Sequence, residues 1–474
     1  IPVLLMAGRS PHTLRGELPG SRDTYVHFVQ DPFDQASLVR PYVKWEYSLP
    51  TGVIAKEALR RAHTLMQSDP KGPVYLMLPR ETLAESWDAN AVHPFPESRY
   101  GPVAAGGADP DVVAALAGRL LAAREPVLIT AYAGRNPASV ALLDELARFA
   151  GIRVFEFNPL HLNIPHDSPC FAGFAPGKHV AQADFGMLVD IDVPWIPRDM
   201  PDNPATWWAH IDVDAVKRGF PMWGFPSNLR IEGDSSRILA QLLEALRARA
   251  TPAFVAGARR RVAALAAEHR QRMEGVARLA ADKGAPGRIN PQYLCAELGR
   301  AIAPDDIVLN EAIRNGPAVF SQVPRSKPGT LIGLAGGGLG FSGGMALGMK
   351  LAQPGRTVLQ IVGDGSFYFC NPEAVYAVAA QYRLPIFTVV LDNGGWAAVK
   401  EATLRMHPEG EAKRLGAYAS QLAQGMAFAK IGEAAGAYGE TLTEPAEAAA
   451  AIRRCLDEVR GGRSAVLHVH IGPH

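Results

Sequence analysis

The stretch VLQIVGDGS (358–366) is an apolar run typical of a buried strand, and it ends in a glycine turn that carries one carboxylate. A second apolar run, IFTVVLDNGG (386–395), follows after one helix-like segment and ends in another polar turn. Strands that alternate with helices in this way form a doubly wound parallel sheet, and ligands bind beyond the carboxyl ends of its strands. We therefore expect Asp364 and Asn393 to meet at one edge of a sheet.

The residues at these strand ends are typical of a metal site. Asp364 and Asn393 provide a carboxylate and an amide oxygen, and Gly395 provides a loop carbonyl; such hard oxygen donors suit Mg²⁺ or Ca²⁺ bridging a diphosphate. Gly363 and Gly365 allow the backbone to approach phosphates closely. A lone Gly-Asp-Gly is usually a simple turn, so the prediction depends on Asn393, 29 residues after Asp364.

This combination resembles the thiamine diphosphate-dependent enzymes of the decarboxylase and acetolactate synthase-like superfamily, particularly benzoylformate decarboxylase and its relatives. The resemblance implies that Asp364 and Asn393 bind Mg²⁺ through their side chains and that Gly395 binds it through its carbonyl. The family usually has an Asn-Asn pair where this chain has Asp392-Asn393. The departure removes no expected ligand.

A second segment, GGGLGF (336–341), resembles the part of the family that supports the bent shape of the cofactor, with Leu339 as the apolar wedge. Glu311 follows the apolar run Ile307–Asn310 at another strand end, where it could contact the diphosphate or the substrate. The predicted cofactor-binding residues are thus Gly338, Leu339, Gly363, Gly365, Ser366 and Glu311. Trp396 and Lys400 are candidates for the substrate pocket, although Trp396 equally fits a place in the core.

The whole chain is expected to be α/β, with three doubly wound parallel-sheet domains. Residues 1–88 resemble the C-terminal half of a pyrimidine-binding domain, residues 109–250 form a central α/β domain, and residues 288–474 form the diphosphate- and magnesium-binding domain. The predicted strands are Ile1–Met6, Pro73–Leu78, Pro126–Thr130, Ile152–Phe157, Phe185–Val189, Trp207–Ile211, Ile307–Asn310, Thr330–Leu334, Val358–Val362 and Ile386–Leu391. Asn290 and Pro291 predict a capped helix start.

The first domain is expected to be truncated at its N-terminus, because the run IPVLLMAG already reads as a buried strand. The family activates its cofactor with a glutamate from the first half of that domain. We therefore expect the activating glutamate upstream of Ile1, and no catalytic residue is assigned within the chain. A non-catalytic, cofactor-binding relative is one alternative.

The function implied by the resemblance is cleavage or formation of a carbon–carbon bond next to a carbonyl, by a decarboxylase or carboligase of a small 2-oxo acid. An acetolactate synthase-type enzyme is an alternative, although Arg9 stands where those enzymes carry Gln and no flavin pattern occurs in residues 126–200. Bound FAD is therefore not expected. From another class, Gly338-x-Gly340-x-x-Gly343 fits the fingerprint of a nicotinamide-dependent dehydrogenase.

The composition of the chain argues against some classes of binding partner. The chain has 48 Lys plus Arg and 47 Asp plus Glu, which argues against binding to nucleic acid. No apolar run approaches the roughly 20 residues of a membrane-spanning helix. The four cysteines form no close pair, as expected for reduced core cysteines in the cytoplasm. Since the family builds its active sites between two subunits, the resemblance implies a homodimer or homotetramer.

Overall fold

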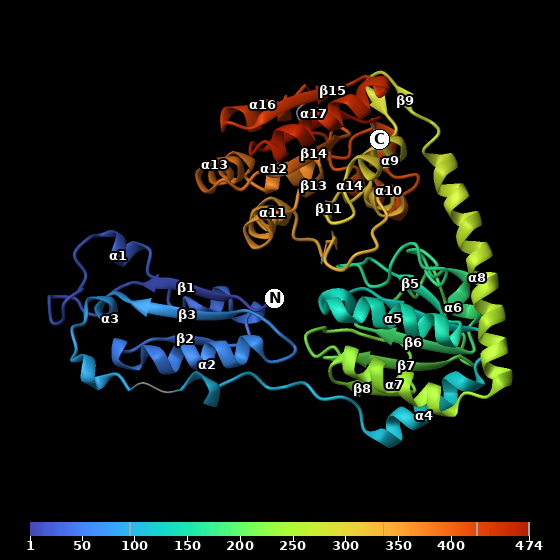
Figure 1. Cartoon of the computed structure of the whole chain (residues 1–474). Helices are drawn as coiled ribbons and strands as arrows, with labels where there is room; N and C mark the ends of the chain where they lie inside the picture. Colours follow the sequence, from blue (N-terminus) through green and yellow to red (C-terminus); the bar gives the residue numbers. More distant parts are fainter. Residues whose placement is uncertain (94–95, 335, 423–424, 473–474) are drawn as a thin grey trace. The chain divides into compact units, whose positions relative to one another are not determined.

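The computed structural model describes residues 1–93, 96–334, 336–422 and 425–472. It divides into two compact units, Ile1–Gly107 and Ala108–His474, and each is described here by itself. The cartoon in Figure 1 shows the elements of both units with their labels. Residues 89–108, which separate the first two predicted domains, end at the boundary between the units. The three predicted domain ranges stay predictions.

The first unit holds a parallel sheet in the order β1-β3-β2. Its elements are β1 (Leu4–Arg9), α1 (Val26–Val29), β2 (Glu46–Ser48), α2 (Ala55–Gln67), β3 (Val74–Pro79) and α3 (Arg80–Ala84), with 3₁₀ turns at Ala36–Leu38, Arg40–Tyr42, Gly52–Ile54, Ala89–Ala91 and Glu97–Arg99. The amphipathic helix α2 buries Ala58 and Ala62. The strand expected at Ile1–Met6 is present but runs from Leu4 to Arg9, and the expectation that it is buried was wrong: Met6 is 59% exposed because β1 lies at the sheet edge.

The central sheet of the second unit is parallel, in the order β5-β4-β6-β7-β8. Its elements are α4 (Pro110–Ala122), β4 (Pro126–Thr130), a 3₁₀ turn (Ala133–Arg135), α5 (Pro137–Ala150), β5 (Arg153–Glu156), α6 (Lys178–Gln182), β6 (Phe185–Val189), β7 (Trp207–Asp212), β8 (Leu229–Glu232) and α7 (Ser235–Arg249). Helices α4, α5 and α7 pack on one face. The other face is covered by α6 and by loops that bury Trp195 against Trp208.

The C-terminal sheet is parallel, in the order β12-β11-β13-β14-β16-β15. Its strands are β11 (Ile307–Glu311), β12 (Leu331–Ile332), β13 (Val358–Gly363), β14 (Phe387–Asp392), β15 (Tyr438–Leu442) and β16 (Ala465–His470). The helices and the 3₁₀ turn are α9 (Pro291–Ala301), α10 (Gly316–Gln322), α11 (Phe341–Ala352), α12 (Asp364–Phe369), α13 (Pro372–Tyr382), α14 (Ala397–Met406), α15 (Glu411–Leu415), α16 (Phe428–Ala434), η7 (Pro445–Glu447) and α17 (Ala448–Arg460).

Both faces of this sheet are buried, which explains why its central strands read as continuous apolar runs. Ile361 and Val389 point to a core shared with α9, α10 and α17. Their neighbours in the chain, Val362 and Val390, point to a core shared with α11, α13 and α16. The turns after β13 and β14 are thereby fixed side by side at the carboxyl edge of the sheet.

One long helix, α8 (Pro252–Leu279), follows the central sheet and contacts both α5 and α10. Figure 1 shows it in yellow-green, passing from the central sheet toward the C-terminal one. A short hairpin of β9 (Gly284–Ala285) and β10 (Arg288–Ile289) comes next. The side chain of Asn290 then accepts a hydrogen bond from the backbone of Gln292 at 2.9 Å, so the predicted cap of α9 is confirmed.

The prediction of several parallel-sheet α/β domains is confirmed. All four cysteines are buried and free, as expected of reduced core residues. Within the described ranges, no helix combines the length and the apolar character that crossing a membrane requires.

Candidate functional site

A cavity of about 260 Å³ lies at the carboxyl ends of β11, β13 and β14. It is lined by Ala312, Ile313, Arg314, Asn315, Leu334, Gly337, Leu339, Gly363, Asp364, Gly365, Ser366, Asn393, Gly395, Trp396, Ala397, Ala398 and Val399. The structure therefore brings together the three predicted metal ligands, the predicted wedge Leu339 and the strand-end glycines. We call this space the cleft below.

Asp364 is a buried carboxylate of the cleft. It directly follows β13 and is only 2% exposed, and its Oδ2 has no hydrogen-bond partner in the part of the chain that the structure describes. Burial, followed by the charge of nearby Asp392, raises the pKa of Asp364 to about 7. A buried carboxylate oxygen without a partner is costly, and a cation beside it would offset that cost.

The second turn needs glycine for its shape. Gly394 has a φ of 82°, in the left-handed region, and its N–H donates to Asp392 Oδ1 at 2.9 Å. The N–H of Gly395 donates to Asn393 Oδ1 at 3.2 Å, and a methyl group built on Gly395 would lie 2.2 Å from the carbonyl oxygen of Ser420. Asn393 and Gly395 are thus held at the cleft wall by a tightly packed loop.

Trp396 packs directly against the first turn. A methyl group built on Gly365 would lie 2.2 Å from Nε1 of Trp396, so this glycine leaves room for the indole. The indole also stacks on Phe369, with ring centroids 5.9 Å apart. Trp396 lines the cleft and also supports the turn that carries Asp364, and its place in a substrate pocket stays a prediction. Lys400 is outside the lining, and its Nζ lies 5.4 Å from the ring centre of Tyr418.

Glu311 binds the end of the glycine-rich segment through hydrogen bonds. Its buried carboxylate accepts hydrogen bonds from the N–H of Gly340 and from both the N–H and the hydroxyl of Ser342, at the start of α11. Burial raises the pKa of Glu311. The carboxylate therefore anchors the segment that carries Gly338 and Leu339, and neither Glu311 nor Gly338 is part of the cleft lining.

The glycines of the dinucleotide-like pattern have a packing explanation. A methyl group on Gly340 would lie 2.4 Å from the carbonyl oxygen of Phe369, and one on Gly343 would lie 2.9 Å from Cγ2 of Val375. Both glycines let α11 approach the segment formed by α12 and α13. The pattern is thus accounted for without a nicotinamide cofactor.

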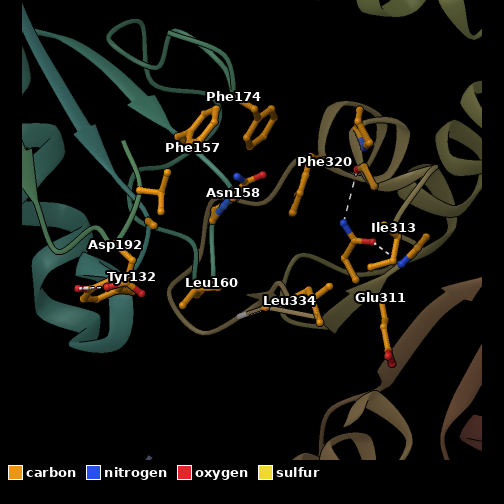
Figure 2. Close-up of a pocket in the computed structure, with 18 of the residues that line it drawn as sticks. Tyr132, Phe157, Asn158, Leu160, Phe174, Asp192, Glu311, Ile313, Phe320 and Leu334 are labelled. Atoms are coloured by element: carbon orange, nitrogen blue, oxygen red, sulfur yellow. Dashed lines mark hydrogen bonds between the residues drawn. The ribbon is translucent and has the colours of Figure 1, made fainter. Parts of the chain in front are cut away.

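A larger cavity of about 560 Å³ adjoins the cleft and shares Ala312, Ile313 and Leu334 with it. Its other lining residues come from the central and C-terminal sheets: Ala131, Tyr132, Phe157, Asn158, Pro159, Leu160, Phe174, Ala175, Asp192, Val193, Asn310, Glu311, Gly316, Pro317, Phe320 and Gly336. Figure 2 shows the Phe320 ring between the Phe157–Phe174 pair and the side chain of Leu334, with the Glu311 carboxylate directed away from the rings. Phe174 and Phe320 stack with centroids 5.2 Å apart.

Comparison with known proteins identifies the family. The model of the thiamine pyrophosphate enzyme C-terminal TPP binding domain matches residues 317–469, which include the turns at Asp364 and Asn393 and the glycine-rich segment 336–341. Residues 317–469 are a C-terminal domain of the thiamine diphosphate-dependent enzymes. This match decides against the nicotinamide-dependent dehydrogenase.

Relatives from several branches of the thiamine diphosphate-dependent enzymes match most of the chain. A benzoylformate decarboxylase of Pseudomonas aeruginosa is 27% identical over 417 residues, covering 84% of this chain and 70% of the relative. Acetolactate synthase isozyme 3 large subunit of Escherichia coli is 25% identical, covering 99% and 79%. The structure of a thiamine diphosphate-dependent 4-hydroxybenzoylformate decarboxylase from Rhodococcus jostii RHA1 aligns with a TM-score of 0.76, 20% identity, and coverage of 100% and 83%. The predicted fold and superfamily are confirmed.

The residues of the cleft fit the cofactor of thiamine diphosphate-dependent enzymes. Asp364 Oδ2 is a buried oxygen that lacks a partner among the described residues, and Asn393 and Gly395 add hard oxygen donors beside it.

The sequence interpretation missed Ile313 of the cleft wall. The signal was present, because Ile313 lies just beyond the strand that ends at Glu311, at the edge where ligands of such sheets bind.

Proposed function

We propose that the protein is a thiamine diphosphate- and Mg²⁺-dependent 2-oxo acid decarboxylase or carboligase. The observation that carries the proposal is the convergence of Asp364, Asn393 and Gly395 in one cleft, with a buried carboxylate oxygen that no described residue satisfies. The match to a benzoylformate decarboxylase supports the 2-oxo acid substrate.

The chain's own residues have separate tasks in this proposal. Asp364 and Asn393 would hold Mg²⁺ through their side chains, and Gly395 through its carbonyl. Gly363, Gly365, Ser366 and Gly338 would allow the diphosphate close to the backbone. Leu339 would support the bent shape of the cofactor, and Glu311 would position Leu339 through its hydrogen bonds to the start of α11.

Thiamine diphosphate, when bound, supplies the electron sink for the electron pair of the broken bond. In the net reaction the bond between the carbonyl carbon and the carboxylate breaks, carbon dioxide leaves, and the carbonyl carbon takes up a proton. The product is an aldehyde, or an acyl group joined to a second carbonyl compound when the enzyme acts as a carboligase.

The substrate would be a 2-oxo acid with an apolar or aromatic side chain. The cavity beside the cleft has a wall of three phenylalanine rings together with Leu160, Ile313 and Leu334. Pockets with such walls take up apolar groups, because burying them removes apolar surface from water. Trp396 borders the cleft and would contact the substrate near the reacting carbon, whereas Lys400, held over Tyr418, would act at greater distance.

Three further features remain predictions. They are assembly as a homodimer or homotetramer, a cytoplasmic location, and the absence of bound FAD. Each follows from the family resemblance or from composition. They do not affect the cleft assignment, which rests on residues of the C-terminal sheet.

The proposal is tested by replacing Asp364 with Ala. Removal of a ligand should weaken Mg²⁺-dependent binding of thiamine diphosphate by roughly tenfold or more, because even partners that only support a metal ligand are worth 10–100-fold in metal affinity. Calorimetry with thiamine diphosphate and Mg²⁺ measures the change, and Asp457→Ala, at an exposed carboxylate of α17, serves as the control.

The same proteins are assayed for carbon dioxide release from benzoylformate and from pyruvate. We expect faster turnover of benzoylformate. Unchanged cofactor affinity in Asp364→Ala would refute the site assignment, and cofactor binding without carbon dioxide release from either acid would favour the non-catalytic alternative.

A further inference from the structure

Two histidines at the end of the last strand of the C-terminal sheet lie outside the cleft lining. His468 and His470 are two residues apart on β16, so their side chains emerge on the same face of the sheet. Strand β16 pairs in parallel with β14, and His470 lies opposite Asp392 in the register. Asp392, His468 and His470 therefore gather on one face at the carboxyl edge.

The distances between these three side chains are short. Nε2 of His468 lies 2.8 Å from Oδ2 of Asp392, and one nitrogen or oxygen atom from each residue lies within 4.8 Å of those of the other two. The two imidazole rings have centroids 4.7 Å apart. His468 is buried against Phe428, whereas Asp392 and His470 are half-buried. The group is thus partly enclosed yet open to an ion from solvent.

We propose that Asp392, His468 and His470 form a second metal site, for a transition-metal ion such as Zn²⁺ or Co²⁺. Two imidazole nitrogens and one carboxylate oxygen are the donor set that such ions prefer, and Mg²⁺ prefers oxygen alone. The protein would then carry two different sites, one made of oxygen donors at Asp364 and one rich in nitrogen at His468.

The geometry needs only small adjustments. Zinc ligands lie about 2.0–2.2 Å from the ion, so neighbouring ligand atoms in a tetrahedral site are roughly 3.3–3.5 Å apart. The His468–Asp392 pair must open by about 0.5–0.7 Å from 2.8 Å. Atoms at the outer limit of 4.8 Å must close by about 1.4 Å, which rotation of the half-buried His470 ring can provide.

The two sites would be linked by the loop that follows β14. Asp392 directly precedes Asn393, and its second carboxylate oxygen, Oδ1, accepts the N–H of Gly394 at 2.9 Å. An ion on Oδ2 would therefore fix the start of the loop that presents Asn393 and Gly395 to the cleft. The inference concerns ion binding alone and does not depend on the proposed reaction.

The test uses the full chain, stripped of metal with EDTA and titrated with Co²⁺ in excess Mg²⁺ without thiamine diphosphate. We expect one bound Co²⁺ per chain, visible d–d absorption, and displacement by Zn²⁺. His470→Gln should weaken Co²⁺ binding by roughly tenfold or more, since the loss of a direct ligand should cost at least as much as the loss of a supporting partner.

Matched variants separate this site from others. His407→Gln, at an exposed histidine of the same sheet domain, should bind Co²⁺ like the wild type. Asp364→Asn should also retain the Co²⁺ signal, because Asp392 and both histidines remain in place; the variant removes only the charge that faces Asp392. His468→Gln should lose the signal, provided that circular dichroism shows a folded protein. Wild-type affinity in His470→Gln, loss of the signal in Asp364→Asn, or no Co²⁺ bound by the wild type would overturn the proposal.

Discussion

At the scale of single residues, a buried carboxylate near a strand end makes the stability of the protein depend on pH. Asp190 follows β6 in the central sheet and is 1% exposed. Its carboxylate accepts a hydrogen bond from the hydroxyl of Ser235 at 2.7 Å and pairs with Arg135 at 3.1 Å. Burial is the largest influence on its pKa and, despite the opposing charge of Arg135, raises it to about 7. The stability of the protein should therefore depend on pH through this residue.

Asp190→Asn tests this dependence. A carboxyl titrates near 3.9 in an unfolded chain, so between about pH 4 and pH 7 the folded protein holds a proton that the unfolded chain has released. The stability contributed by Asp190 is full below about pH 4 and is lost as the pH rises through about 7. Since Asn does not titrate, the melting temperature of Asp190→Asn relative to wild type should increase from pH 5 to pH 8.

The corresponding difference in unfolding free energy is on the order of a few kcal/mol at most. Scanning calorimetry at both pH values measures it. Asp202→Asn, which removes an exposed carboxylate in the same sheet domain, is the control. If the melting temperatures of Asp190→Asn and wild type differ by the same amount at pH 5 and pH 8, the raised pKa of Asp190 is contradicted.

At the scale of elements, the start of α11 depends on a side chain from a different strand. Glu311, the last residue of β11, binds the backbone N–H groups of Gly340 and Ser342. The first N–H groups of a helix lack partners within it, and a negative charge there is favourable. Glu311 thus connects β11 to the segment that carries Leu339.

Glu311→Ala should release this connection and cost about 1–3 kcal/mol, the usual penalty when a buried donor loses its partner. Hydrogen exchange of the amides at 340 and 342 should become faster, while amides of α17 on the opposite face remain protected. Glu311→Gln retains one acceptor oxygen and should give an intermediate rate. Equal exchange rates in all three proteins would show that the carboxylate does not hold the helix.

Elements with simple patterns were predictable from sequence, and those with mixed patterns were not. Strands β4 and β6 have the predicted bounds, because each is a short, wholly buried apolar run. Strand β16 was missed because His468 and His470 interrupt its apolar pattern, and the pairing with Asp392 exists only once β14 and β16 are in register. Strand β15 was missed because its sequence, YGETL, is largely polar.

Some residues of the candidate site could likewise be predicted from local sequence patterns, and others could not. Asp364, Asn393 and Gly395 could be placed together because both turns follow neighbouring strands of one sheet. The orientations of Glu311 and Lys400 could not be predicted. They depend on Ser342 and on Tyr418, which are distant in the sequence and contribute no local pattern.

At the scale of the whole molecule, a short stretch of backbone joins the central and C-terminal sheets of the second unit. The N–H of Gly333 donates to the carbonyl of Leu160 at 3.1 Å, and Ile332 forms a β-bridge with His161. A methyl group on Gly333 would lie 1.9 Å from the carbonyl oxygen of Pro159. The residues after β5 and after β12 can approach this closely only because Gly333 has no side chain.

Gly333→Ala should therefore lower the melting temperature of the protein by a few degrees, because forcing a methyl group into packed backbone typically costs about 1–3 kcal/mol. Gly344→Ala is the matched control. It lies in α11 with no atom within 4 Å of the added methyl, and should be neutral or stabilising by up to about 1 kcal/mol. If Gly333→Ala has the melting temperature of the wild type, the backbone around residue 333 accommodates the methyl group without loss of stability.

The contact between Gly365 and Trp396 also bears on how this protein can change over evolutionary time. The two residues belong to different turns, yet the indole occupies the space that any side chain at 365 would need. A side chain at 365 is therefore accommodated more easily in a lineage that has already acquired a smaller residue at 396, whereas a smaller residue at 396 needs no prior change at 365. Divergence at this pair has a preferred order, which reconstructed ancestral sequences would record.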